Sequence, residues 1–311
     1  MQGEKKKYLS RRMSLGRHVS GWVVERPSLH LSKLELDKLK ADLQRIGERT
    51  LPDTVLDYGV FNTDGDAFKR SLITVLYDRK SGEPVAFNSM PILNLDVQGR
   101  AEEVLHLGLV MVDPNARSGG LSSILYGFAC IIFLIKRQLR PIWISSVTQV
   151  PAVVGLVSEL YSNTFPSPKA NARRSFTHLQ IARRIMESHR SAFGVGAEAG
   201  FDEQSFVISN AYTGGSDNLK KTYESAPKHR KDIYNDMCAQ NLDYHRGDDF
   251  LQIGQLDIAA IRHYFTGKDK DAPLLGATIA IAFFSLQSIF MPVLYWFDDR
   301  KHWGELRPWK L

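Results

Sequence analysis

The sequence has few cysteines and no cysteine pair at a metal-binding spacing. Only Cys130 and Cys238 occur among the 311 residues, and no C-x-x-C motif is present. The histidines also lack the spacings that are typical of metal ligands. A disulfide scaffold is therefore not indicated, and we expect no metal site. Such sparse cysteine usage is typical of proteins from a reducing compartment.

Several common signatures of phosphate and acyl chemistry are also missing. No G-x4-G-K-[ST] motif occurs, which excludes a P-loop, and no G-x-G-x-x-G motif marks a dinucleotide-binding turn. No histidine is followed at the fifth position by aspartate, the pair that glycerolipid acyltransferases use. The first residues carry charge but no apolar run, so we expect no secretory signal and residence in the cytoplasm.

Positive charge is present but unevenly distributed, and the net charge is +6. Residues 1–18 carry six Lys or Arg against one Glu, and residues 169–190 have the same balance. We expect residues 1–18 to form a basic, mobile tail. Basic segments attract phosphates, anionic lipids, nucleic acid or acidic carrier proteins, or they remain a solvated face.

Alternating segments predict a mixed α/β core. Ser32 and Glu35 form the S-x-x-E capping box of a helix over residues 31–49, in which leucines recur at helical spacing. The apolar run 102–113 is typical of a strand in the middle of a sheet. Further strands are predicted at 18–27, 71–78, 83–97, 140–148, 205–212 and 249–257, and further helices from the turn near 120 to 138 and at 150–163, whereas residues 213–248 give no clear prediction.

Two segments suggest contact with a membrane. Residues 173–190 predict a basic amphipathic helix, which suits either a membrane surface, an anionic partner or a surface helix packed on the sheet. Residues 274–297 contain no charge over 24 positions, a length that spans a bilayer, and aromatic residues gather at their C-terminal end. A buried core helix or helical hairpin is the alternative for this second segment.

The stretch VDPNARSGGLSSILYG (112–127) joins a strand to a helix and has the chemistry of an anion site. Free N–H groups at a helix N-terminus bind phosphates, and the glycines allow close approach of the backbone to a ligand. Arg117 adds a guanidinium that pairs with phosphate through two hydrogen bonds. The residues predicted for this phosphate-binding turn are Arg117, Ser118, Gly119, Gly120, Leu121 and Ser122. A purely structural turn is the alternative.

The same stretch resembles the coenzyme A-binding segment of the GCN5-related N-acetyltransferase superfamily. The family pattern is Gln/Arg-x-x-Gly-x-Gly/Ala after a strand that ends in Val-x-Pro. Arg117, Gly120 and Ser122 occupy its positions after Val112-Asp113-Pro114, and Ser122 departs from Gly/Ala. The resemblance implies an α/β fold with a mixed, mostly antiparallel central sheet flanked by helices, here followed by a C-terminal helical, partly apolar extension.

The resemblance also implies acyl transfer from a thioester to an amine, with the amides of Leu109, Val110, Met111 and Val112 contacting the thioester and pantetheine. His106, the polar residue in an apolar run, is the candidate general base, and Glu103 and Glu102 are alternates. Tyr161 stands where the family has a general acid that reprotonates the thiolate. Each of these residues has a core-packing alternative.

The resemblance further suggests the long-chain N-acyltransferase branch, because a small acetyltransferase would not need segments 173–190 and 274–297. We expect acyl-CoA or acyl carrier protein as the donor, no permanently bound cofactor, an amine-bearing lipid as the acceptor, location at the cytoplasmic face of a membrane, and no nucleic-acid partner. An acetyltransferase for a protein, peptide or small amine and a non-enzymatic acyl-CoA-binding membrane protein are the alternatives. The expected parts are a tail (1–18), a core (19–168), the basic helix with an insertion and remaining strands (169–257), and an extension (258–311).

Overall fold

The computed structural model describes residues 8–15, 18–52, 59–62, 66–119 and 121–261. The chain divides into one unit that ends at Ile261 and a second unit from Arg262 to Leu311, which lies outside the described residues. The predicted apolar segment 274–297 therefore lies outside the description. Within the described residues, no helix combines the length and the apolar character needed to cross a membrane.

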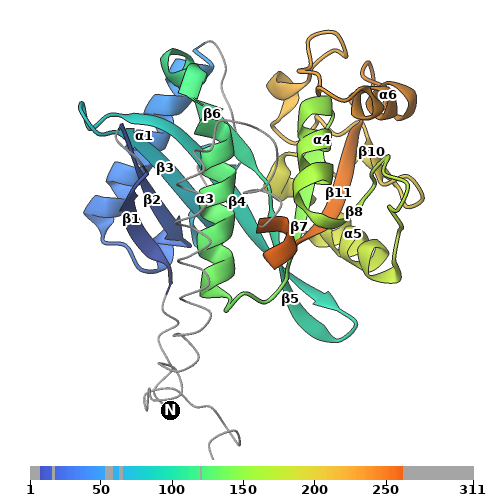
Figure 1. Ribbon diagram of the computed structural model, residues 1–311, viewed down its shortest axis with the longest axis horizontal. Helices are drawn as coiled ribbons and strands as arrows, with labels where there is room; N and C mark the ends of the chain where they lie inside the picture. The colour runs from blue at the N-terminus through green and yellow to red at the C-terminus, as the bar shows by residue number, and fades with distance from the viewer. Residues whose placement is uncertain (1–7, 16–17, 53–58, 63–65, 120, 262–311) are drawn as a thin grey trace, which may run out of the picture. The chain divides into compact units, whose positions relative to one another are not determined.

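The described residues form an α/β fold with a large, mostly antiparallel sheet flanked by helices (Figure 1). The strand order is β1-β2-β3-β4-β5-β7-β11-β10-β9, with β6 on β4 and β8 on β11. The strands are β1 Ser10–Ser14, β2 Val19–Glu25, β3 Ser71–Asp78, β4 Pro84–Val97, β5 Arg100–His106, β6 Leu109–Val112, β7 Ile142–Thr148, β8 Ser162–Phe165, β9 Gly200–Asp202, β10 Val207–Ser209 and β11 Asp249–Leu256.

Helices cover both faces of the sheet. The α-helices are α1 Lys33–Thr50, α2 Ala67–Arg70, α3 Leu121–Lys136, α4 Pro151–Leu160, α5 Phe176–Ser188 and α6 Asp232–Asn241. Short 3-10 helices are η1 Pro27–Leu29, η2 Gly59–Phe61, η3 Pro114–Gly119, η4 Arg190–Phe193 and η5 Asp217–Leu219. Phe87 of β4 packs toward α1, whereas its neighbour Ala86 packs toward α3, so α1 and α3 lie on opposite faces.

The predicted mobility of residues 1–18 is wrong for residues 10–14. These residues form β1, which pairs antiparallel with β2 along its whole length, from Ser10 opposite Val24 to Ser14 opposite Ser20. The Trp22 indole N–H donates to Ser10 Oγ at 3.2 Å, and the Arg12 guanidinium lies 4.5 Å above the Trp22 ring. Backbone pairing with β2 and the contact with Trp22 therefore hold residues 10–14 in a strand. The high positive charge of this segment, taken alone, predicts a mobile tail.

The predicted helix over 31–49 is confirmed as α1, together with its capping box. Ser32 Oγ accepts from the Glu35 N–H at 3.3 Å, and the Glu35 carboxylate accepts from the Ser32 N–H at 3.0 Å. Leu39, Leu43 and Ile46 are fully buried against the sheet. Local capping and the apolar stripe agree here, which is why the sequence predicted this element accurately.

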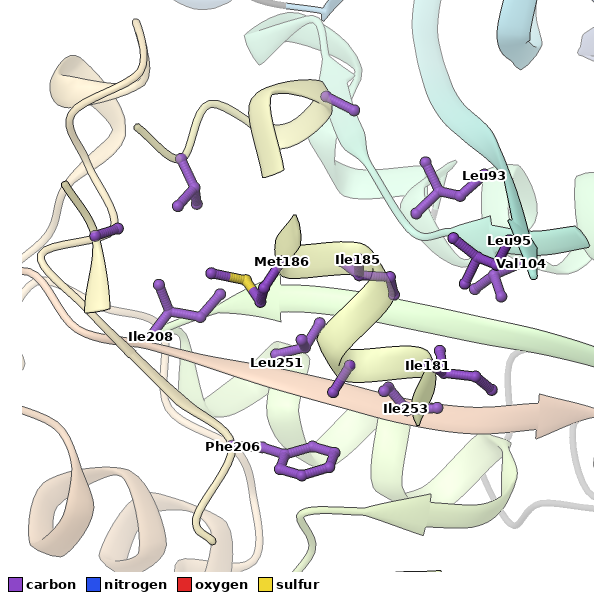
Figure 2. Packing of buried hydrophobic residues seen from close by; sticks show 14 of the residues in the cluster. Leu93, Leu95, Val104, Ile181, Ile185, Met186, Phe206, Ile208, Leu251 and Ile253 are labelled. Carbon is purple, nitrogen blue, oxygen red and sulfur yellow. The ribbon is translucent and has the colours of Figure 1, made fainter. Parts of the chain in front are cut away.

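The membrane-surface interpretation of helix 173–190 is wrong, and the surface-helix alternative is confirmed. The apolar face of α5 is buried in a core cluster with Leu93, Leu251 and Ile253 of the sheet (Figure 2). Arg183 forms a bidentate ion pair with Glu203, at 2.6 and 2.7 Å. An apolar face that already packs inside the protein is not available to a lipid surface.

The sheet continues past residue 168, so segments 19–168 and 169–257 share one sheet. β11 lies antiparallel to β7, with Phe250 opposite Thr148, and β8 pairs with β11 on its other side. The predicted strand 205–212 is shorter than expected, and neither β8 nor β9 was predicted. Strands of three or four residues carry too little periodicity to be recognised from sequence.

Candidate active site at the parting of two strands

The central sheet opens where β5 ends. β5 and β7 are parallel, and their register runs from Val104 opposite Trp143 to His106 opposite Ser145. The Leu107 N–H still donates to the Ser145 carbonyl at 2.7 Å. β6 continues the chain from β5 but pairs with β4. The edges of β6 and β7 therefore diverge beyond the His106–Ser145 level and leave an opening in the sheet.

A β-bulge separates β5 from β6. Ile92 of β4 lies opposite Leu105, whereas Ser89 lies opposite Leu109. Two residues of β4 thus face three residues, 106–108, on the other strand. A bulge of this kind shifts the alternation of the strand by one residue and bends it locally. The bulge therefore decides which backbone groups of β6 face β4 and which face the opening.

Two amides of β6 face the opening. The Asp113 N–H donates to the Val85 carbonyl of β4 at 2.9 Å. By strand alternation Met111 and Leu109 also face β4, and the N–H groups of Val110 and Val112 point away from it. Of the four amides that the sequence predicted as donors, the geometry thus directs two toward the β7 edge.

The opening holds a cavity of about 260 Å³. Its walls come from both strand edges, including His106, Gly108, Val110 and Val147. α3 contributes Tyr126 to the wall, and η4 contributes Phe193. The remaining lining residues are Gly59, Val60, Ser89, Pro91, Leu107, Leu109, Ser146, Thr148, Val153 and Ala192. The cavity wall is therefore of mixed polarity and combines apolar side chains with backbone groups and polar side chains.

His106 is the buried titratable residue of this cavity. Its side chain is 1% exposed, its Nδ1 lies 3.0 Å from Ser145 Oγ, and its ring stacks on Phe193 with 4.7 Å between centroids. Burial lowers the pKa of His106 to about 3 because the charged ring would lose its hydration. The imidazole is therefore neutral at pH 7. The sequence singled out His106, but it gave no sign of Ser145 or Phe193 as its neighbours.

The structure places Tyr161 and Glu103 away from this cavity. The Tyr161 hydroxyl faces Cys130 Sγ at 3.4 Å, on the α3 side of the sheet. Glu103 forms ion pairs with Arg26, at 3.1 Å, and with Arg137 near the other end of β5. Neither residue is among the described residues that line the cavity. Their catalytic roles remain predictions, and the contacts observed are structural. Glu102, the other alternate, lines a separate hollow near the same end of β5.

The predicted phosphate-binding turn begins α3. Pro114–Gly119 form the short helix η3, which includes the backbone of Arg117, Ser118 and Gly119, and α3 starts at Leu121. Leu121 is buried and Ser122 is exposed in the first turn, whereas Gly120 lies outside the described residues. The turn therefore directly follows β6, and its role in binding a diphosphate remains a prediction.

Asp113 organises the start of that turn. Its Oδ1 accepts from the Asn115 N–H at 2.9 Å, and its Oδ2 pairs with the Arg49 guanidinium of α1 at 3.3 Å. The carboxylate is buried to 7% exposure, whereas the Arg49 side chain is 42% exposed. This contact ties the C-terminal end of α1 to the chain that follows β6. The sequence pattern included Asp113 only as the middle residue of Val112-Asp113-Pro114, and it gave no sign of Arg49.

The backbone N–H groups of this region are of the kind that bind the pantetheine arm and the diphosphate of coenzyme A. Val110 and Val112 offer backbone N–H groups along the opening, and the turn after Val112 leads into the N-terminus of α3. Such groups suit the amides of pantetheine and a diphosphate, respectively. In the part of the chain that the structure describes, no group of three His, Cys, Asp or Glu side chains is arranged to hold a metal ion.

Comparisons with known proteins return acetyltransferase structures of low similarity. The sequence matches no family profile, and no curated protein matches it. A nourseothricin acetyltransferase structure is 20% identical over 25% of this chain and 41% of its own, with a TM-score of 0.19. A ribosomal-protein alanine acetyltransferase from Vibrio fischeri is 10% identical over 50% of this chain and 85% of its own, with a TM-score of 0.31.

A third structure, a spermidine N-acetyltransferase variant from Vibrio cholerae, is 13% identical over 39% of this chain and 73% of its own, with a TM-score of 0.28. The chain thus spans less than half of the nourseothricin enzyme's length. At these TM-scores the likeness carries no argument about activity.

Proposed function

We propose that this protein transfers an acyl group from a coenzyme A thioester to an amine in the cavity between β6 and β7. One observation carries the proposal. The sheet parts immediately after His106, so that the backbone of Val110 and a neutral imidazole border one small space of mixed polarity. A backbone donor aimed at the reacting carbonyl stabilises the oxyanion that develops during acyl transfer.

In this reaction the amine nitrogen attacks the thioester carbonyl carbon, the new C–N bond forms and the C–S bond breaks. The N–H group of Val110 donates to the oxyanion, and that of Val112, two residues further along the strand, donates to the pantetheine arm. His106 takes the proton that the amine loses, and the leaving thiolate gains a proton. A neutral imidazole is the form that accepts a proton, but a pKa of about 3 makes it a weak base, so His106 can hold this proton only briefly before the leaving thiolate takes it.

The donor is held at two places in this proposal. The pantetheine arm lies along the open edge of β6, and the diphosphate meets the turn that contains Arg117 and Gly120 and leads to Leu121. A phosphate at a helix N-terminus gains from the free N–H groups and from the helix dipole. Acyl carrier protein is the other donor that we propose, because it presents the same pantetheine arm.

For the acceptor we propose an amine-bearing lipid, such as a sphingoid base, and a long acyl chain, as in the long-chain N-acyltransferase branch and bacterial ceramide synthase. The uncharged segment 274–297 supports this assignment, together with location at the cytoplasmic face of a membrane. Helix α5 no longer supports it, because its apolar face packs on the sheet. An acetyltransferase acting on a protein, peptide or small amine is the competing assignment.

The test combines donors and acceptors in one matrix. The full chain is incubated with acetyl-CoA or palmitoyl-CoA and with a sphingoid base, a polyamine, an amino acid or a lysine peptide. Free thiol is followed in time, and the amide product is identified by mass. We expect thiol release that depends on the amine. The Arg117→Ala, Gly120→Asp double variant should lose binding of acyl-CoA in calorimetry.

The outcomes separate the assignments. Transfer from palmitoyl-CoA to the lipid amine supports the lipid branch, and transfer from acetyl-CoA to a small or peptide amine replaces it with the competing assignment. Binding of acyl-CoA without thiol release for any acceptor, and indifference to His106→Ala, would leave a non-enzymatic acyl-CoA-binding protein. Undiminished binding by the double variant would refute the role of the turn.

A further inference from the structure

A tyrosine of α3 contacts the bulge that separates β5 from β6. The hydroxyl of Tyr126 donates to the carbonyl oxygen of Gly108 at 3.2 Å. Gly108 belongs to the three residues that face only two residues of β4, so its carbonyl lies outside the regular ladder. Tyr126 is half-buried and lines the cavity. The hydrogen bond therefore connects α3 to the point at which the strand alternation changes.

Gly108 is confined from the opposite side. A Cβ atom on this residue would lie 2.3 Å from the carbonyl oxygen of Ser89 and 3.0 Å from Pro91 Cδ. Neither neighbour is free to yield, because Ser89 belongs to the β4 backbone and Pro91 has a fixed ring. β4 thus packs closely against the bulge on one side. On the α3 side, the Tyr126 hydroxyl donates a hydrogen bond to the Gly108 carbonyl.

We infer that the Tyr126 hydroxyl is a positioning group that fixes the bulge at Gly108 and thereby aims the amide of Val110 into the cavity and that of Val112 along the open edge of β6. This inference rests on the proposed function for its catalytic consequence. The reason is geometric, because the position of the bulge sets which N–H groups of β6 face β4 and which face the opening. If the bulge moved by one residue, the amides of Leu109 and Met111 would face the opening instead.

The inference assigns to Tyr126 a role that the sequence analysis gave to no residue. Tyr126 acts through the backbone, and it needs no contact with the reacting atoms. A small displacement of the oxyanion donor affects the transition state more than it affects binding of the ground-state thioester. Loss of the hydroxyl should therefore lower kcat while KM for acyl-CoA stays close to its original value.

The test compares Tyr126→Phe with Tyr244→Phe in the full chain. Tyr244 is a matched control, because it is also half-buried and its hydroxyl also donates to a backbone carbonyl, that of Gln149, at 2.6 Å. We expect Tyr126→Phe to lower kcat by about tenfold to a hundredfold, as small misplacements in active sites do. Tyr244→Phe should keep the kcat of the original protein.

A second readout does not depend on turnover. Carbon-13 labelling of the Gly108 carbonyl and nitrogen-15 labelling of valine report the bulge and the Val110 and Val112 amides by NMR. Tyr126→Phe should shift these signals and change the response of the two amides to added coenzyme A, and Tyr244→Phe should not. Gly108→Ala, which cannot keep the close approach to Ser89, should show the same changes to a larger degree.

Unchanged kcat and unchanged signals in Tyr126→Phe would overturn the inference. Equal loss of kcat in both tyrosine variants would also overturn it, because a general loss of packing on removal of a partly buried hydroxyl would then explain the effect. If the original protein transfers no acyl group to any amine, the proposed function fails by itself. The NMR signals then decide the inference, since they report the bulge and the orientation of the amides without any reaction.

Discussion

The rings of His106 and Phe193 stack with their planes inclined by only 22°, although 87 positions separate the two residues in sequence. Phe193 ends the short helix η4, and the left-handed residue Gly194 follows it. Arg190 holds the same loop through hydrogen bonds to the carbonyls of Ala197 and Ala199, both at 3.2 Å. The loop after α5 thus brings an apolar ring onto the imidazole and removes water from it.

This contact predicts how His106 titrates. Phe193→Ala should raise the pKa of His106 from about 3 toward its ordinary value of 6.5, because water then solvates the charged ring. NMR titration of the imidazole signals measures the change directly, and Phe193→Leu, which keeps much of the cover, is the control. A pKa that stays near 3 in the alanine variant would show that Phe193 is not the group that excludes water.

The same shift predicts acid sensitivity. The pKa of folded His106 lies below that of the unfolded chain, so the unfolded state binds the proton first as the pH falls. The stabilising contribution is present above about pH 6.5 and is lost toward pH 3, by at most about 1.4 kcal/mol per pH unit. Denaturant titrations at pH 7 and pH 5 measure this slope. A His106→Gln variant should lose it, and an unaltered slope would contradict the assignment.

The raised pKa of Asp249 predicts that the folded protein loses stability as the pH rises, the opposite of the effect of His106. This carboxyl is buried, accepts a hydrogen bond from Tyr212 at 3.0 Å, and has a pKa raised to about 8, chiefly because burial disfavours its charged form. The folded state keeps a proton that the unfolded state loses above pH 3.8, so stability falls as the pH rises toward 8. Asp249→Asn should reduce this decline in denaturant titrations at pH 6 and pH 8.5. A decline of equal size in the variant would contradict the prediction.

The Arg49–Asp113 pair predicts an effect on donor binding. Asp113→Asn keeps an acceptor for the Asn115 N–H but loses its charge, so the tie to α1 weakens while the turn keeps its cap. We expect about a threefold to tenfold weaker affinity for coenzyme A, because one charge-assisted bond is worth on the order of 1 kcal/mol at a half-exposed site. Affinity for pantetheine, which lacks the diphosphate, should be unchanged. Calorimetry with both ligands, in a cycle with Arg49→Gln, tests the pair.

The two thiols are expected to be inert in the folded protein. Burial raises the pKa of Cys130 to about 11 and that of Cys238 to about 12, so neither forms the reactive thiolate at pH 8. A chromogenic disulfide reagent should therefore report only the thiol released from coenzyme A. Rapid reaction of one equivalent or more with the native protein alone would contradict this prediction, and reaction of both thiols in denaturant is the control.

The sequence predicted the long elements because their local signals agree with their packing. β3 begins and ends at the predicted residues 71 and 78, and α1 has the predicted capping box. Prediction failed where distant partners decide the structure. β1 is ordered by β2 and Trp22, and α5 buries its apolar face against β4 and β11 rather than presenting it to a membrane. Charge patterns describe solvation, but they do not reveal which surface a helix covers.

By itself, the sequence determined the order of the main strands and helices, the polar residue His106 within the apolar run 104–112, and the glycine-containing turn after it. These features follow from periodicity, capping and residue type, which are local. Only the tertiary structure decided that the pairing of β5 with β7 ends at Ser145, that the N–H groups of Val110 and Val112 face the opening, and that Phe193 and Tyr126 line the cavity there. Strand register and the burial of a side chain depend on segments far apart in the chain, so no local pattern encodes them.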